Sequence, residues 1–189
     1  AVNTVVNNEG MLKGYNTDMD GFLEPIKKRY IQIEGEKILL LGAGGAARAI
    51  VAGMAKEKAG NLDIVNRTTL NANNLAEFAT KLGLKTNIKK IEETNNHIEN
   101  YDIIINSTSI GLKNEVSPIS FEGANQKTIV YDIVYAPMNT DFIKKAKERK
   151  LEVIYGYEML LGQATRAFEI WHEMKAPYNA MKKALLGGF

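Results

Sequence analysis

The chain has 189 residues, of which 45% are hydrophobic and 24% are charged, with 24 basic residues against 22 acidic ones and no cysteine. This composition is typical of a folded globular protein and excludes disorder as the dominant state. A net charge of +2 without a basic cluster argues against nucleic acid as the main partner. Without cysteine and with only two histidines, the chain can form no disulfide, and we expect no metal site.

No segment of the sequence is predicted to cross a membrane. Residues 38–55 are the most apolar stretch, but they contain four glycines and Arg48, whereas a spanning helix needs about 20 apolar residues without a central charge. Residues 1–6 lack the basic flank and the apolar core of a secretory signal. We therefore expect a cytoplasmic protein with no membrane partner. Because the chain does not begin with Met, we also expect it to start inside a longer protein.

The first predicted elements precede a glycine-rich turn. Residues 1–6 read as a short strand that ends at the turn-forming residues 7–10. Residues 18–30 carry apolar side chains at helical spacing, with two acidic residues near the start of this predicted helix. Residues 37–41 are a lysine followed by an unbroken apolar run, typical of a strand buried on both faces. The glycine-rich turn then leads into a predicted helix at residues 46–58.

The rest of the chain continues the alternation of strands and helices. We predict strands at 61–66, 86–89, 101–106, 128–134 and 151–155, and helices at 70–82 and 141–149. Strands separated by helix-length connections indicate an α/β protein with a doubly wound parallel sheet, a Rossmann fold with flanking helices. Residues 158–186 are predicted to be helical, with an interruption at Pro177, and to dock on something besides the sheet.

The glycine-rich turn predicts a dinucleotide site. Residues 42–47 follow a buried strand and open a helix, and they fit the fingerprint of such sites with alanine at the last small position. Gly42 permits the tight turn, Gly44 lets the backbone approach a pyrophosphate, and the helix N-terminus favours the anion. The same pattern also occurs in turns that bind no ligand. The predicted cofactor contacts in this segment are Gly42, Ala43, Gly44, Gly45 and Ala46.

The end of the second strand of the predicted sheet distinguishes NAD from NADP. Enzymes that use NAD carry an acidic residue there, which binds the ribose and would repel a 2′-phosphate. This chain has no carboxylate at residues 66–69. Arg67 can offer a bidentate guanidinium to a 2′-phosphate, and Asn66 and Thr68 add further donors. The sequence therefore predicts NADP as the cofactor, the alternative being that Arg67 is a solvated loop residue.

Further motifs stand in order along the chain. They are AVNT at residues 1–4, GYNTD at 14–18 with Gly21 after it, NSTSIG at 106–111 and GYEMLLGQA at 156–164. Together with residues 42–47 and 66–68, these motifs resemble the shikimate dehydrogenase family over the whole chain. The resemblance implies an enzyme of aromatic amino-acid biosynthesis that interconverts 3-dehydroshikimate and shikimate with NADPH, and these two small molecules are its expected substrates.

The family's N-terminal substrate domain precedes the AVNT motif and carries two substrate-binding serines and the catalytic lysine, positions that this sequence does not contain. The chain thus resembles the remainder of such an enzyme. We expect a remnant of the substrate domain and a linking helix at residues 1–30, an NADP-binding domain at 31–155, and C-terminal helices at 156–189 that pack back toward the substrate domain. Because the lysine lies upstream, we expect the isolated chain to be inactive.

The resemblance also assigns substrate-binding residues. Asp18 matches the family's catalytic aspartate, which partners the lysine and binds a substrate hydroxyl, whereas the residue pattern alone favours a helix N-cap. Asn3 and Gln163 match ligands of substrate hydroxyls, and an amide can both donate and accept, as a polyol requires. Tyr135 matches a tyrosine near the substrate ring. Without the resemblance, Asn3 and Gln163 read as structural residues, and for Tyr135 a role as a partly buried aromatic stays equally open.

The nicotinamide half of the cofactor is expected at the end of the fourth strand. Asn106 and Thr108 close that strand at a switch point of the sheet, where open α/β sheets bind ligands. The resemblance adds the backbone at Ile133 and Gly156. Glycine at position 156 would allow the close approach to the nicotinamide that only a residue without Cβ permits.

Two other functions stay open from the sequence. A quinate/shikimate dehydrogenase would accept either substrate, but it usually prefers NAD and carries an acidic residue near the end of the second strand. The other alternative is a catalytically silent NADP-binding module. Without the substrate domain, apolar docking surfaces at residues 1–6 and on the C-terminal helices would be exposed. We therefore expect the isolated chain either to self-associate there, for example as a homodimer, or to be disordered there.

Overall fold

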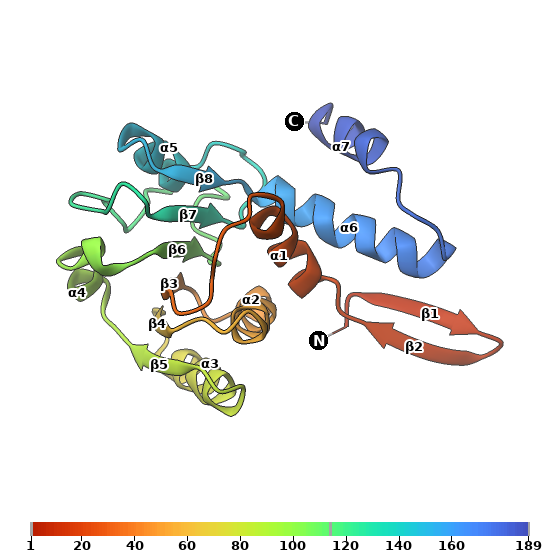
Figure 1. Cartoon of the computed structure of the whole chain (residues 1–189), viewed down its shortest axis with the longest axis horizontal. Coiled ribbons are helices and arrows are strands. Elements are labelled where there is room, and N and C mark those ends of the chain that lie inside the picture. The colour runs from red at the N-terminus through yellow and green to blue at the C-terminus, as the bar shows by residue number, and fades with distance from the viewer. Residues whose placement is uncertain (1, 114, 189) are drawn as a thin grey trace.

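A six-stranded parallel sheet forms the centre of the molecule in the computed structural model, which describes residues 2–113 and 115–188. The strands lie in the order β5-β4-β3-β6-β7-β8 (Figure 1). Because the chain turns back between β3 and β6, this is the doubly wound Rossmann topology, and the predicted fold class is confirmed. The strand bounds are β3 Lys37–Leu41, β4 Asn61–Val65, β5 Lys85–Ile88, β6 Ile103–Asn106, β7 Ile129–Asp132 and β8 Glu152–Ile154.

Helices cover both faces of the sheet (Figure 1). Alternate residues of β3 belong to two cores: Ile38 and Leu40 pack with α1, α2 and α3, whereas Leu39 and Leu41 pack with α5. This double burial explains the continuous apolar run in β3. No helix in the described part of the chain is long and apolar enough to cross a bilayer. The helix bounds are α1 Asp18–Lys28, α2 Gly45–Lys56, α3 Thr69–Lys81, α4 Ile91–Asn95, the 3₁₀ helix η1 Ile98–Asn100, α5 Asp141–Glu148, α6 Gly156–His172 and α7 Tyr178–Leu186.

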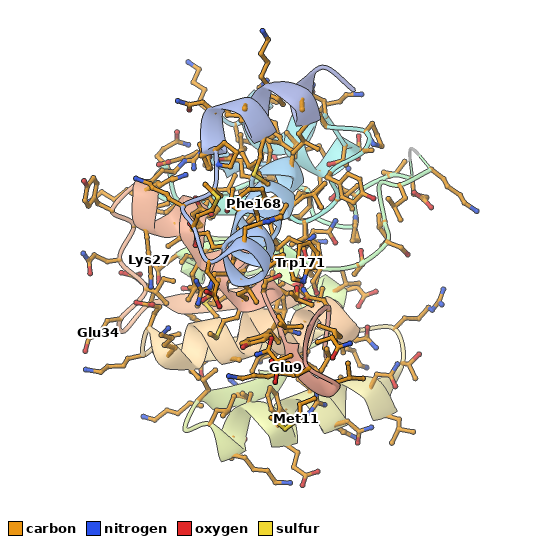
Figure 2. The ribbon with its side chains drawn as sticks, turned by 90° about the vertical axis from the view of Figure 1, so that its right-hand side faces the viewer. Glu9, Met11, Lys27, Glu34, Phe168 and Trp171 are labelled. Atoms are coloured by element: carbon orange, nitrogen blue, oxygen red, sulfur yellow. The ribbon has the colours of Figure 1, made fainter. Side chains whose placement is uncertain are left out.

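A two-stranded antiparallel hairpin, β1 (Thr4–Asn8) and β2 (Met11–Tyr15), extends from one side of the molecule (Figure 1). Its tight turn contains Glu9 and Gly10, both with positive φ, as two-residue hairpin turns require. The expected strand at residues 1–6 is therefore displaced, and the sequence analysis missed β2. The indole Nε1 of Trp171 in α6 donates to the carbonyl of Val5 at 3.0 Å, which fastens the hairpin to α6 (Figure 2).

Two further differences concern short or interrupted helices. The sequence analysis did not predict α4 and η1, which are short and come from a polar stretch. The expected helix at 158–186 begins two residues earlier, at Gly156, and is divided into α6 and α7. The division follows from Glu173, which adopts a left-handed conformation, and from Pro177 before α7.

The two helices α1 and α6 pack unusually closely because a glycine of each lies at their contact. A Cβ on Gly21 would lie 2.6 Å from the backbone nitrogen of Gln163, and a Cβ on Gly162 would lie 2.9 Å from the Cα of Gly21. Any side chain at either position would push the helices apart. This contact brings the first turn of α1 close to the middle of α6.

Candidate active site

A cavity of about 880 Å³ opens at the C-terminal ends of β3, β4 and β6. Its position is the switch point of the sheet, where the connections after β3 and β6 diverge and where doubly wound folds bind their ligands. Four segments supply most of its walls. They are the β3–α2 turn at residues 42–44, the β4–α3 turn at 66–69, the β5–α4 segment at 88–92 and the loop after β6 at 107–110.

The glycine-rich turn leaves room for a ligand at the N-terminus of α2. Gly42 has φ +101°, and a Cβ there would lie 2.8 Å from the hydroxyl of Ser107, so both conformation and packing require glycine. Gly44 is the N-cap of α2, and no atom lies within 4 Å of a Cβ built on Gly44 or Gly45. The space in front of these residues is open. An anion could therefore approach the free amides at the start of the helix.

Arg67 lies on the β4–α3 turn and faces the same cavity. Its side chain is exposed and makes no hydrogen bond or ion pair with the residues that the structure describes. Asn66 donates through Nδ2 to the carbonyl of Thr68 at 2.8 Å, so its amide group stabilises the turn. Lys90, which the sequence analysis did not consider, also lines the cavity. Arg67 and Lys90 thus bring positive charge to the wall of the cavity, to which the segment of Lys90 also contributes the carboxylate of Glu92.

Asn106 and Thr108, expected at the other end of the cavity, form a hydrogen-bonded unit. Asn106 is buried, and its Oδ1 accepts from the amide and the hydroxyl of Thr108 at 3.1 and 2.6 Å. Its Nδ2 donates to Asp132 Oδ1 at 2.9 Å. Burial raises the pKa of Asp132 to about 6. The sequence analysis missed Asp132, although an acidic residue inside the apolar run of β7 was a visible signal.

Packing within the chain gives Gly156 a reason for being glycine in addition to the one expected from the sequence. A Cβ there would lie 2.4 Å from the carbonyl oxygen of Val134 and 2.6 Å from the carbonyl carbon of Ile133. The start of α6 therefore packs directly on the chain that follows β7. Ile133 is half-buried, and its amide donates to the backbone carbonyl of Asn106 at 3.0 Å. The packing of the chain on itself already requires glycine at position 156.

Three of the four residues assigned to the substrate meet in one cluster. Asn3 Nδ2 lies 2.8 Å from Asp18 Oδ1, 3.1 Å from Thr17 Oγ1 and 3.4 Å from Gln163 Oε1. The Oδ1 atom of Asn3 accepts from the amide of Thr17 at 3.0 Å, which fixes the orientation of the Asn3 amide group. We call Asn3, Asp18 and Gln163 the polar cluster. It joins the segment before β1, the first turn of α1 and the middle of α6.

The structure corrects one expectation about a single residue, the cap assigned to Asp18. Asp18 is the first residue of α1, and the N-cap is Thr17, so the interpretation of Asp18 as a helix cap is wrong. Its charge still lies in the first turn, where an anion stabilises the helix. Tyr135 is 45% exposed and makes no hydrogen bond with the described residues of the polar cluster.

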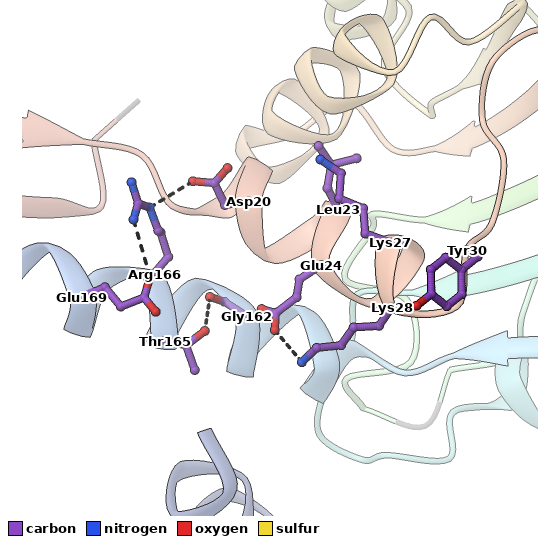
Figure 3. Close-up of a pocket in the computed structure, with 10 residues that line it drawn as sticks. All are labelled: Asp20, Leu23, Glu24, Lys27, Lys28, Tyr30, Gly162, Thr165, Arg166 and Glu169. Atoms are coloured by element: carbon purple, nitrogen blue, oxygen red, sulfur yellow. Dashed lines mark hydrogen bonds and ion pairs between the residues drawn. The ribbon is translucent and has the colours of Figure 1, made fainter. Parts of the chain in front are cut away.

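A second cavity, of about 520 Å³, lies between α1 and α6 (Figure 3). Its charged groups largely pair with each other: Lys28 Nζ lies 2.6 Å from Glu24, and Arg166 lies 3.5 Å from both Asp20 and Glu169. Because these charges already have partners, we assign no ligand to this cavity.

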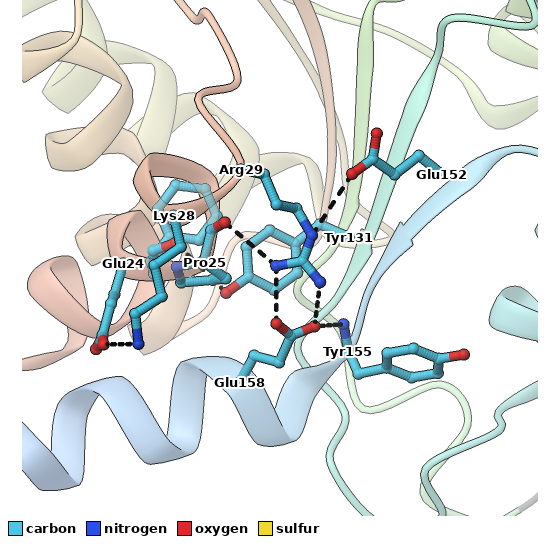
Figure 4. Close-up of polar contacts among 9 residues, drawn as sticks. Glu24, Pro25, Lys28, Arg29, Tyr131, Glu152, Tyr155 and Glu158 are labelled. Atoms are coloured by element: carbon cyan, nitrogen blue, oxygen red, sulfur yellow. Dashed lines mark hydrogen bonds and ion pairs between the residues drawn. The ribbon is translucent and has the colours of Figure 1, made fainter. Parts of the chain in front are cut away.

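An ion pair fixes the start of α6 relative to α1 (Figure 4). The two terminal nitrogens of Arg29 lie 2.8 and 3.0 Å from the two carboxylate oxygens of Glu158, and Nη1 also donates to the carbonyl of Pro25. Glu158 accepts in addition from the amide of Tyr155 at 3.1 Å. Two parallel hydrogen bonds of this kind fix both the distance and the orientation of the carboxylate relative to the guanidinium. It therefore holds the helix that carries Gln163.

Comparisons with known proteins identify the family of the chain. The family described as "Shikimate / quinate 5-dehydrogenase" matches residues 24–144, and the "Shikimate 5'-dehydrogenase C-terminal domain" matches residues 156–186. The chain is 70% identical over its whole length to the shikimate dehydrogenase (NADP(+)) of Nitrosopumilus maritimus and spans 69% of that protein.

Solved structures with the same fold include two with bound ligands. Shikimate 5-dehydrogenase from Listeria monocytogenes, in complex with shikimate and NAD, has a TM-score of 0.89 and 33% identity, covering 98% of this chain and 68% of its own. The Thermus thermophilus enzyme, in complex with NADP(H) and shikimate, has a TM-score of 0.84 and 34% identity, covering 100% of this chain and 69% of its own. With 70% identity to one family member and a family match over most of its length, the chain belongs to the shikimate/quinate 5-dehydrogenase family.

Proposed function

We propose that this chain is the cofactor-binding part of a shikimate dehydrogenase that reduces 3-dehydroshikimate to shikimate with NADPH. The polar cluster carries the proposal, because three elements distant in sequence bring Asn3, Asp18 and Gln163 within hydrogen-bonding distance. Groups that donate and accept at one place suit a ring with several hydroxyls. The name of the Nitrosopumilus maritimus relative and the ligands of the Thermus thermophilus enzyme support the same substrate and cofactor.

The residues around the large cavity fit NADP. The open space at Gly44 and Gly45 suits a pyrophosphate on the N-terminus of α2. The unpaired guanidinium of Arg67 suits a 2′-phosphate, as its planar donors match phosphate oxygens. Asn106, Thr108 and the backbone at Ile133 and Gly156 would hold the nicotinamide half. The full set that we propose for the cofactor is Gly42, Ala43, Gly44, Gly45, Ala46, Asn66, Arg67, Thr68, Asn106, Thr108, Ile133 and Gly156.

The polar cluster has the proposed task of orienting the substrate. When bound, NADPH supplies the hydride for carbonyl reduction. Asn3 and Gln163 hold the ring hydroxyls, and Tyr135 lies along the ring. Asp18 holds the proton-donating lysine that the family carries upstream and accepts from a substrate hydroxyl. Fixed orientation of substrate and cofactor accounts for much of the rate.

The activity can be tested by joining this chain to the remaining N-terminal part of the Nitrosopumilus maritimus protein, of which it spans 69%. We expect the chimera to oxidise NADPH with 3-dehydroshikimate and the 189-residue chain to show no turnover. Asp18→Asn should lower kcat of the chimera by about two to four orders of magnitude, since it disturbs proton transfer.

Asp20→Asn is the matched control. Asp20 lies two residues further along α1 and faces Arg166 at 3.5 Å, so its loss should change kcat by less than about threefold. Turnover by the isolated chain, or an unchanged kcat in the Asp18→Asn chimera, would overturn the assigned roles. A chimera that binds NADP without turnover would instead support a silent cofactor-binding module.

A further inference from the structure

Asp132 is a fully buried carboxyl at the end of β7, and its hydrogen-bond partners are all uncharged. They are Asn106 Nδ2 at 2.9 Å, the amide of Val134 at 3.0 Å and the hydroxyl of Thr140 at 2.5 Å. Burial of a carboxyl without a cationic partner is costly, and this cost is the reason that its pKa is raised. Because a buried carboxyl is costly, we examined which groups Asp132 holds in place.

The two oxygens of Asp132 have separate partners. Oδ1 accepts from both Asn106 and Val134, whereas Oδ2 accepts from Thr140, the N-cap of α5. Oδ1 therefore connects the end of β6 with the residues after β7. Oδ2 connects β7 with the start of α5 and has no direct link to the cavity.

Asn106 connects Oδ1 of Asp132 with the loop after β6 through hydrogen bonds. It accepts from the amide and the hydroxyl of Thr108 and donates to the carbonyl of Ile110 at 3.1 Å. The hydroxyl of Thr108 in turn accepts from the amide of Ile110 at 3.1 Å. Thr108 and Ile110 both line the large cavity. A continuous set of hydrogen bonds thus runs from a carboxyl that no ligand can touch to the cavity wall.

We propose that Asp132 is a positioning residue for the nicotinamide half of the cofactor, which acts through Oδ1 and Asn106 on the loop at residues 108–110. The inference rests on the proposed function. Arg67 and the β4–α3 turn, which we assign to the adenosine half, share no hydrogen bond with this network in the described residues. Binding of the adenosine half is therefore independent of Asp132. The charge itself is not required, because an amide oxygen can accept the same two hydrogen bonds as Oδ1.

Calorimetry on the 189-residue chain with NADP⁺ and with adenosine 2′,5′-bisphosphate tests the inference. Asp132→Ala should weaken NADP⁺ binding by about tenfold or more, as expected for the loss of an ordered binding loop, and change binding of the bisphosphate by less than about twofold. Asp132→Asn keeps an oxygen at Oδ1 and should bind NADP⁺ within about threefold of the unaltered chain. Thr140→Val removes only the Oδ2 contact and the α5 cap, so it should lower Tm without changing the ratio of the two affinities.

A measurement on the unaltered chain covers the case that Asp132→Ala does not fold. NADP⁺ should slow hydrogen exchange at the amides of Thr108, Ile110 and Val134, whereas the bisphosphate should not. Three results would overturn the role of Asp132. Asp132→Ala could weaken binding of NADP⁺ and of the bisphosphate equally, or it could bind NADP⁺ as tightly as Asp132→Asn does. The third result is that both ligands slow hydrogen exchange at these amides to the same extent. A chain that binds neither ligand would overturn the proposed cofactor function, and the role of Asp132 with it.

Discussion

Arg67 is the side chain on which the choice between NADP and NAD depends. It is exposed and unpaired among the described residues, so a 2′-phosphate would gain its guanidinium without breaking an existing ion pair. We expect Arg67→Ala to reduce the preference for NADP⁺ by about ten- to hundredfold, corresponding to roughly 1.5–3 kcal/mol, with NAD⁺ affinity nearly unchanged. Arg48→Ala, which removes an arginine that lies over Phe78 instead, is the matched control in calorimetry. Equal loss of both cofactors would show that Arg67 supports the fold.

Gly42 and Gly44 lie two residues apart, yet replacement of Gly44 should affect cofactor binding and replacement of Gly42 should affect stability. Gly44→Val should abolish NADP⁺ binding with little change in Tm, because its Cβ would enter open space in front of the helix amides. Gly42→Ala should lower stability by about 1–3 kcal/mol, because φ +101° is strained for alanine and Ser107 is in the way. Calorimetry and thermal melts on both variants test this. Normal affinity in Gly44→Val would remove the glycine-rich turn from the cofactor site.

Asp132 should make stability depend on pH in a defined direction. Its pKa is about 6 in the folded chain against an ordinary value of 3.8, so between these values the folded state binds more protons than the unfolded state. The contribution of Asp132 to stability therefore falls as the pH rises through this window. Asp132→Asn lacks this titration, and its stability relative to the unaltered chain should rise by about 2–2.5 kcal/mol between pH 4 and 7. Urea denaturation at both pH values measures the gain, and a constant difference would contradict it.

The sequence predicted the site residues to different degrees. The glycine-rich turn and Arg67 follow from local spacing, since a strand, a turn and a helix place them together. Asn3 and Gln163 are 160 residues apart, and only the family resemblance connected them with Asp18. Asp132 is polar in an apolar strand, a signal that the sequence analysis did not use. Side-chain hydrogen bonds such as those of Asn106 depend on tertiary packing, and the hydrophobic periodicity of the sequence does not predict them.

Among the elements, the pair of α1 and α6 determines where Asp18 and Gln163 lie. Their closest contact runs through Gly21 and Gly162, so Gly162→Ala should lower the free energy of unfolding by about 1–3 kcal/mol through overpacking. Gly45→Ala, also in a helix but with open space at Cβ, should leave stability equal or higher. Chemical denaturation of the two variants compares them. An unaffected Gly162→Ala variant would show that the helices can separate at little cost.

Most element bounds were predicted to within one or two residues, because apolar runs bounded by polar turns mark the buried strands. The strand β2 was missed since its residues are largely exposed and include Lys13 and Gly14, which weakens any alternation. The helices α4 and η1 span five and three residues, which is too short for helical periodicity to show. The apolar pattern that predicts an element arises because one of its faces is buried. Elements that are exposed or very short lack this pattern, so the sequence does not predict them.

For the molecule as a whole, the hairpin presents apolar side chains to water. Met11 and Leu12 are 77% and 73% exposed, and Trp171 and Met174 lie exposed at the far end of α6 and just beyond it. We expect the isolated chain to self-associate through these side chains, because clusters of exposed apolar side chains mark sites of association. Light scattering should find a concentration-dependent dimer or larger species that Met11→Lys with Leu12→Lys converts to a monomer. Leu70→Lys, on the exposed surface of α3, should have no effect, and a monomeric unaltered chain at all concentrations would refute the expectation.

The amide of Asn3 leaves the polar cluster short of hydrogens. Its nitrogen carries two protons, but three oxygens lie within reach, on Thr17, Asp18 and Gln163. One oxygen must therefore go without a proton from Asn3 at any moment. A hydroxyl of an arriving ligand can supply the missing hydrogen without breaking a bond that the cluster already makes. A ligand hydroxyl, which can both donate and accept, therefore suits these oxygens better than a group that only accepts.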